Sequence, residues 1–136
     1  MGTLDKYLAN LPAFIEWWSL AALLSFAFAA IYLFITPQHE IRLIRQGNVS
    51  AAVCFSGALL GYVLPLASAL VHGDSLFDFL LWGLVAMLVQ VVVYFLLRLL
   101  IRNLTSYIEE DRIAVAILAA TVSLCSGILN AAAMVY

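Results

Sequence analysis

The chain has 136 residues, of which 66% are hydrophobic and only 10% are charged. An average soluble domain has roughly 45–50% apolar and about 25% charged residues, and a chain this short cannot bury so many apolar side chains away from water. The formal net charge of −2 gives no support to nucleic-acid binding. The composition therefore predicts one small domain, residues 1–136, with the lipid bilayer as its main partner.

Four apolar stretches, separated by short polar segments, cover residues 17–35, 51–71, 76–97 and 113–136. Each is close to the ~20 residues that a helix needs to cross a ~30 Å hydrocarbon layer. Apolar residues lie on every face of each stretch, unlike the amphipathic helices of soluble proteins. The predicted fold is an all-α membrane protein with four transmembrane helices. The first stretch is expected to be retained as an anchor, because Asp5 balances Lys6 and Glu16 precedes the apolar run.

The basic residues are distributed unevenly over the short connections. All but one of the six lie in or beside the links between spans one and two and between spans three and four, namely Arg42, Arg45, Arg98, Arg102 and Arg112. Short cytoplasmic loops carry an excess of Lys and Arg. The sequence therefore predicts a multi-pass protein of the bacterial inner membrane, with both termini periplasmic and these two links cytoplasmic.

This layout divides the chain into two helix hairpins, at about residues 13–71 and 76–136. Both hairpins enter the membrane from the same side, so they are predicted to be tandem parallel repeats related by an axis along the membrane normal. A shift of 64 residues aligns identical residues in the two halves, among them Ile44 with Ile108 and Ala52 with Ala116. Identities of this kind are weak evidence for a repeat. The matching layout of the two hairpins is stronger evidence.

Several segments resemble a known family. They read ITPQHE at 35–40, LIR at 43–45 followed by Asn48, AA at 51–52, FSGALLGYVLPL at 55–66 and GILNAA at 127–132. Together they are similar to the bacterial "domain of unknown function 350" family of small inner-membrane proteins, the YjfL-like group. The resemblance implies a domain carried twice as two-helix units. One departure is Arg112, which stands where the second half would match Asn48.

The resemblance also implies a cellular setting. Members of this family often lie beside genes for a phage-shock-A-like membrane-stress protein and an ATP-grasp ligase similar to glutathionylspermidine synthase. This association implies a role in envelope maintenance or stress response, with the phage-shock-A-like protein as a cytoplasmic partner. It implies no reaction mechanism.

Small residues indicate where helices approach closely. Gly57 and Gly61 form a GxxxG pair in the second span, and Ser123 and Gly127 belong to a small-residue face of the fourth. Such faces favour close helix contacts, either within one chain or between copies in a homo-oligomer. Pro65 in the second span is expected to kink the helix and to free a backbone carbonyl, which must find a partner such as Tyr62, Ser68 or water.

Gln90 and Asn130 are the polar residues placed deepest in the predicted spans. Amides in lipid seek hydrogen bonds between helices, so the two residues are expected to join helices or to line a polar path. Aspartate, glutamate, lysine and histidine are absent from mid-membrane depth in the sequence, which disfavours a proton-driven transporter.

The predicted cytoplasmic links hold the remaining candidates. Asn48 and Ser50 precede the second span and fit the N-cap role, and a ligand at this helix N-terminus is a second reading of Asn48. The acidic run 109–111, formed by Glu109, Glu110 and Asp111, stands opposite Arg42 and Arg45. It is expected to form weak ion pairs between the links or to dock a cytoplasmic partner or a cationic metabolite.

The sequence shows no catalytic, cofactor or metal motif. It has no phosphate-binding loop and no Cys/His cluster, and His39-Glu40 is too isolated to indicate a metal or acid–base site. We therefore expect a non-enzymatic, homo-oligomeric structural or interaction protein without a cofactor. An oligomeric channel or small-solute permease is the alternative, and a membrane enzyme is the least favoured reading.

Overall fold

The computed structural model describes residues 2–134, and this range is all-helical apart from its connections. The elements in chain order are α1 (Gly2–Ile35), α2 (Glu40–Arg45), α3 (Val49–His72), α4 (Leu76–Leu100), α5 (Leu104–Glu109) and α6 (Ile113–Ala133). The four longer helices are long and apolar enough to cross a membrane, which confirms the predicted all-α fold with four such helices. The last two residues of the predicted fourth span lie outside the described residues.

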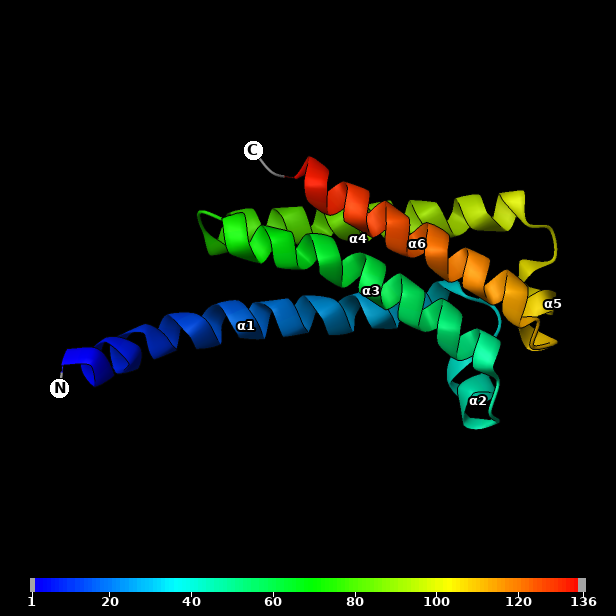
Figure 1. Cartoon of the computed structure of the whole chain (residues 1–136), viewed down its shortest axis with the longest axis horizontal. Helices are drawn as coiled ribbons and strands as arrows, with labels where there is room; N and C mark the ends of the chain where they lie inside the picture. Colours follow the sequence, from blue (N-terminus) through cyan, green and yellow to red (C-terminus); the bar gives the residue numbers. More distant parts are fainter. Residues whose placement is uncertain (1, 135–136) are drawn as a thin grey trace.

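The four long helices give the molecule two ends (Figure 1). Both termini and the turn between α3 and α4 lie at one end, here called the terminal end, and α2 and α5 lie at the other, the loop end. The short helices were not predicted. They match each other, because both have six residues and each follows a residue with positive φ, His39 or Asn103. The starts of α2 and α5, and those of α3 and α6, are 64 residues apart. This spacing agrees with the tandem repeat, which remains a prediction.

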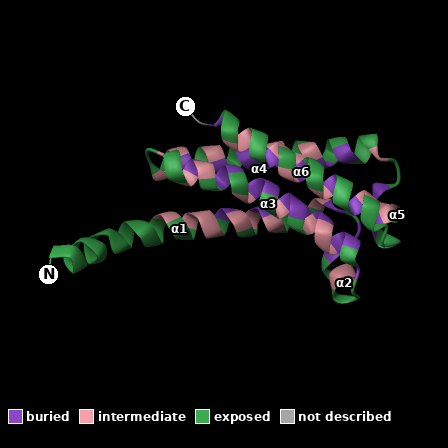
Figure 2. Ribbon diagram, viewed as in Figure 1, coloured by how far each residue is buried: buried purple, intermediate pink, exposed green. Residues whose placement is uncertain are grey.

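Helix α1 begins 15 residues earlier than the predicted first span. Its N-terminal part, residues 2–16, is exposed throughout and extends beyond the other helices at the terminal end (Figure 2). We call this segment the α1 arm. The arm lies outside the predicted first span, because only the region after Glu16 is continuously apolar. The arm instead has apolar residues on one face, with polar residues between them.

The closest helix contact joins α3 and α6. A Cβ atom added at Gly57 would lie 2.5 Å from the Cβ of Ala120, and one added at Gly61 or Gly127 would overlap backbone atoms of the facing helix. The small-residue faces of both helices are therefore used within one chain, as the intramolecular reading of the GxxxG pair expected. Gly61 and Gly127 are consequently not free to form a seam between copies.

Aromatic side chains fill the space between α1 and the other helices. The ring of Phe28 stacks on Tyr62 with centroids 4.6 Å apart, and Trp17 packs on Phe79 at 5.7 Å. Phe28, Tyr62 and Phe79 are almost completely buried. Burial of large rings is a major source of packing energy, so α1 from about Trp17 onward belongs firmly to the bundle.

Candidate functional site

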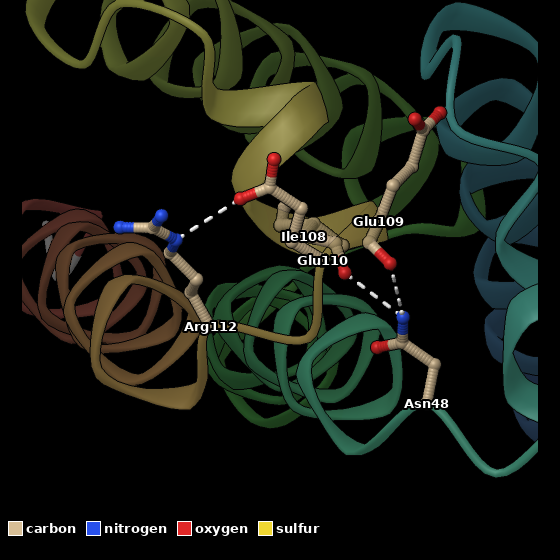
Figure 3. A network of polar contacts seen from close by, with 5 residues as sticks. All are labelled: Asn48, Ile108, Glu109, Glu110 and Arg112. Carbon is tan, nitrogen blue, oxygen red and sulfur yellow. Dashed lines mark hydrogen bonds and ion pairs between the residues drawn. The ribbon is translucent and has the colours of Figure 1, made fainter.

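Asn48 ties the loop end together. Its side-chain oxygen accepts a hydrogen bond from the backbone N–H of Ala51 at 2.8 Å, which caps α3 as predicted. Its side-chain nitrogen donates to the carbonyl oxygens of Ile108 at 2.9 Å and Glu109 at 3.4 Å, at the end of α5 (Figure 3). One side chain therefore both starts α3 and holds α5 against it.

A second link between the same elements runs from Asp111. Its carboxylate accepts a hydrogen bond from the backbone N–H of Ser50 at 2.9 Å, and this N–H holds the pKa of Asp111 below its usual value. Ser50 does not cap α3, because its buried hydroxyl has no hydrogen-bond partner among residues 2–134. Asn48 and Asp111 thus link the start of α3 to the end of α5 and to the turn between α5 and α6.

Among residues 2–134, the predicted ion pairs between the two links are not formed. Within the part of the chain that the structure describes, the salt bridge that forms is Arg112 with Glu110, at 3.0 Å, and both side chains are exposed (Figure 3). The guanidinium of Arg112 also lies over the ring of Tyr107 at 5.0 Å. Arg42 and Arg45 face a cavity of about 490 Å³ beside α2 instead of the acidic run. Hydrogen bonds therefore join the links where the sequence suggested charge pairs.

Glu40, the first residue of α2, is buried beneath this end with 1% of its surface exposed. One carboxylate oxygen accepts a hydrogen bond from the Gln38 side chain at 2.8 Å, whereas the other has no partner in the described chain. Burial raises the pKa of Glu40 to about 7, although the Gln38 amide and the Tyr32 hydroxyl partly oppose this effect. The group can therefore exchange a proton near neutral pH.

Three of the four long helices supply side chains around this carboxylate. Tyr32 of α1, Cys54 of α3 and Tyr94 of α4 are close enough to interact with its charge. The rings of Tyr32 and Tyr94 are 5.6 Å apart in an edge-on arrangement, and the guanidinium of Arg98 lies over Tyr94 at 5.9 Å. We call Tyr32, Glu40, Cys54 and Tyr94 the Glu40 cluster.

Gln90 lies deeper in the bundle, 3% exposed. Its side-chain nitrogen donates to the carbonyl oxygens of Gly61 at 3.0 Å and Ser123 at 3.1 Å, so it joins α4 to both α3 and α6. Its side-chain oxygen is buried without a partner among residues 2–134. Gln90 therefore has the predicted role of joining helices. Asn130 differs, since its buried side-chain nitrogen finds no partner in the same range.

The structure thus separates the predicted residues into three places. Asn48 and the acidic run meet at the loop end, Gln90 meets the glycines at the α3–α6 contact, and Asn130 stands alone toward the terminal end. No group of three His, Cys, Asp or Glu residues suited to a metal ion occurs among the described residues. The Glu40 cluster is not apparent in the sequence, because its members are far apart in the chain. The signal that could have found it was a carboxylate five residues after the end of an apolar span.

The fold and its polar contacts define a class: a small membrane protein of four long helices whose polar groups serve mainly to join helices. Residues 6–134 match the family model described as Domain of Unknown Function (DUF350), and the chain belongs to this family. The UPF0719 inner membrane protein YjfL of Escherichia coli strain K12 is 36% identical over 129 residues, which cover 95% of this chain and 98% of that protein. The protein of the same name from Escherichia coli O157:H7 shows the same identity and coverage. No solved structure matches the chain.

Proposed function

We propose that this protein is a non-enzymatic structural or interaction component of the bacterial inner membrane, and that its loop end faces the cytoplasm and docks a partner. The observation that carries the proposal is the double link of Asn48 to Ile108 and of Asp111 to Ser50. These bonds fix the start of α3, the end of α5 and the acidic run relative to one another, which makes this part of the loop end one rigid surface. A preorganised surface loses little conformational entropy when a partner binds.

The orientation rests on charge. Arg42, Arg45, Arg102 and Arg112 lie at the loop end, whereas the terminal end has Lys6 and three acidic residues of the α1 arm and the α3–α4 turn, Asp5, Glu16 and Asp74. Cations of short loops stay on the cytoplasmic side. The name of the Escherichia coli relative, an inner membrane protein, supports the same membrane. On the basis of the family association, we propose that the docking serves an envelope-stress role and that the partner is a phage-shock-A-like protein.

We also propose that the protein forms a homo-oligomer, but we place the contact between copies away from the glycines of α3 and α6. Because Gly61 and Gly127 are occupied within the chain, we place the contact at an open groove of about 350 Å³ on the outer side of α3 and α6. Its lining includes Ala52, Ser56, Leu60, Ile117, Thr121 and Leu124. Small residues there allow a helix of a second copy to approach closely. Native mass spectrometry from lipid should show an oligomer that Thr121→Trp breaks; a monomeric wild-type protein would remove this part of the proposal.

The channel alternative receives less support from the geometry. Gln90, the amide expected to line a pore, is buried inside the bundle and donates to two backbone carbonyls. A side chain held in this way cannot line a path between copies unless the helices separate.

Site-specific photo-crosslinking tests the docking surface. A photoreactive amino acid at Glu109, exposed at the loop end, should crosslink to a cytoplasmic protein, and the same group at Asp74, exposed at the terminal end, should not. Disrupting the surface with Asn48→Ala should reduce the Glu109 product. Equal products from Glu109 and Asp74, or from Asp74 alone, would contradict the proposal.

A further inference from the structure

Glu40 and Leu104 occupy matching places in the two halves of the chain. Each is the first residue of a six-residue helix, each follows a residue with positive φ, and each is buried, with 1% and 4% of its surface exposed. At Leu104 the position is filled by an aliphatic side chain. A carboxylate is therefore not needed to pack the start of such a helix, and packing alone does not explain Glu40.

Burying a carboxylate is unfavourable unless a positive charge or several hydrogen-bond donors compensate it. The groups around Glu40 come from α1, α3, α4 and the segment before α2: Tyr32, Cys54, Tyr94 and Gln38. All are uncharged near neutral pH. The guanidinium of Arg98 lies over the ring of Tyr94, and Arg42 and Arg45 line the cavity that Glu40 also lines. Among the described residues, none forms a salt bridge with Glu40.

Hydrogen bonds from Gln38 and Tyr32 offset the cost of burial only in part, so we look for the remaining compensation in solution, and it must fit a carboxylate oxygen that has almost no accessible surface. An organic cation is too large for this position, and a metal ion would need a group of ligands that the described residues do not provide. A proton fits, and it needs only brief contact with water. The cavity of about 490 Å³ lined by His39, Arg42 and Arg45 is also lined by Glu40 and is open to solvent, so it gives a proton a route from water to the residue.

We propose that Glu40 is a proton-binding site whose occupancy decides how firmly α2 is held against the bundle. A proton from water forms an O–H bond on the carboxylate oxygen that has no partner, and the neutral acid is then stable in its buried place. When the proton leaves to water, the charged carboxylate favours hydration, and α2 loosens toward the cavity. The raised pKa of Glu40 agrees with this exchange near neutral pH. The site goes beyond the docking function and does not depend on it.

Infrared spectroscopy of the full-length protein in lipid tests proton binding directly. Between pH 5 and 9 the wild type should lose a protonated carboxylic-acid band with a midpoint near 7. Glu40→Gln should lack this band, and Glu109→Gln, which removes an exposed carboxylate, should keep it. A midpoint near the ordinary value of 4.5, or a band that persists in Glu40→Gln, would overturn the proposal.

Hydrogen exchange of the α2 amides tests the coupling. At pH 8 the wild type should exchange faster than Glu40→Leu by up to about 10²-fold, and at pH 5 the two should exchange at similar rates. We expect Glu40→Leu to fold, because a leucine, Leu104, is buried at the matching place in the other half of the chain. A ratio that stays constant from pH 5 to 8 would separate proton binding from α2 and overturn the second half of the proposal.

Discussion

The side-chain nitrogen of Gln90 donates a hydrogen bond to the carbonyl oxygen of Gly61, four residues before Pro65. In an uninterrupted helix this carbonyl would accept from the N–H of residue 65, which proline lacks. The residues that the sequence suggested as its partner are engaged elsewhere, since Tyr62 donates to Gly83 and Ser68 to Ala131. Helix α3 therefore continues through Pro65, and α4 supplies the missing donor.

This relationship predicts that the effects of mutating the two positions are coupled. Gln90→Leu should lower the free energy of unfolding by about 1–3 kcal/mol, because two buried carbonyls lose a donor. In a Pro65→Ala background the helix can satisfy Gly61 itself, so the same change should cost less, by about 1 kcal/mol. Denaturation of all four variants in mild detergent measures the cycle, and strictly additive effects would contradict the account.

Replacing Gly61 should separate α3 from α6. Because a side chain at this position meets the backbone of Ser123, Gly61→Leu should destabilise the protein by at least about 2–3 kcal/mol. Val71→Leu adds volume in the same helix at a position that is 77% exposed, and it should have little effect. The thermal midpoint in detergent is the measurement. Equal midpoints for the two variants would show that the glycine contact is unimportant.

Asn48 combines a cap with a cross-link, and two substitutions separate these roles. Asn48→Asp keeps the oxygen that caps Ala51 but removes the donor to Ile108, whereas Asn48→Ala removes both. We expect a loss of about 1–3 kcal/mol for alanine and a smaller loss for aspartate. Amide exchange in α5 should rise in both variants. If α5 exchange is unchanged by aspartate, the bond to Ile108 does not hold that helix.

The hydrogen bond of Asp111 predicts an acid-sensitive loop end. The pKa of Asp111 is lowered in the folded protein, so the carboxylate's contribution to stability is present above the unfolded-state pKa and is lost as pH falls through the folded-state pKa. Amide exchange at Ser50 should therefore increase below about pH 4. Asp111→Asn retains an acceptor oxygen and should remove this dependence. A wild-type protein with pH-independent protection at Ser50 would disagree with the prediction.

In Figure 1 the α1 arm continues α1 beyond the bundle; in a membrane we predict that the helix bends near Trp17 and that the arm lies along the membrane surface. Its apolar residues recur every three or four positions on one face, are about half exposed or more, and comprise Leu4, Tyr7, Leu8, Leu11, Phe14 and Ile15. The arm continues directly into Trp17, a residue type typical of the membrane interface. Spin labels at Leu8 should therefore sense lipid-soluble oxygen, and labels at Ala9 a water-soluble relaxing agent. Water exposure at both positions would show that the arm rises into solution.

The four spans, the cap at Asn48 and the close helix faces followed from local patterns in the sequence: apolar runs, a polar residue before a helix and small residues at helical spacing. The Glu40 cluster and the Gln90–Gly61 bond did not, because each joins residues from separate helices. The α1 arm was missed because its apolar face is one-sided. Short helices α2 and α5 lie where only polar links were expected. They could not be predicted, because six residues are too few to show a helical period.

Cysteine labelling of the two ends tests the central claim, that the loop end faces the cytoplasm. Cys54→Ser and Cys125→Ser provide a background in which Asp74→Cys or Glu109→Cys is introduced singly, at exposed positions of opposite ends. In intact cells a membrane-impermeant maleimide should label Asp74→Cys, and it should label Glu109→Cys only after the inner membrane is opened. Labelling of Glu109→Cys in intact cells, with Asp74→Cys protected, would invert the orientation and contradict the proposed cytoplasmic docking surface.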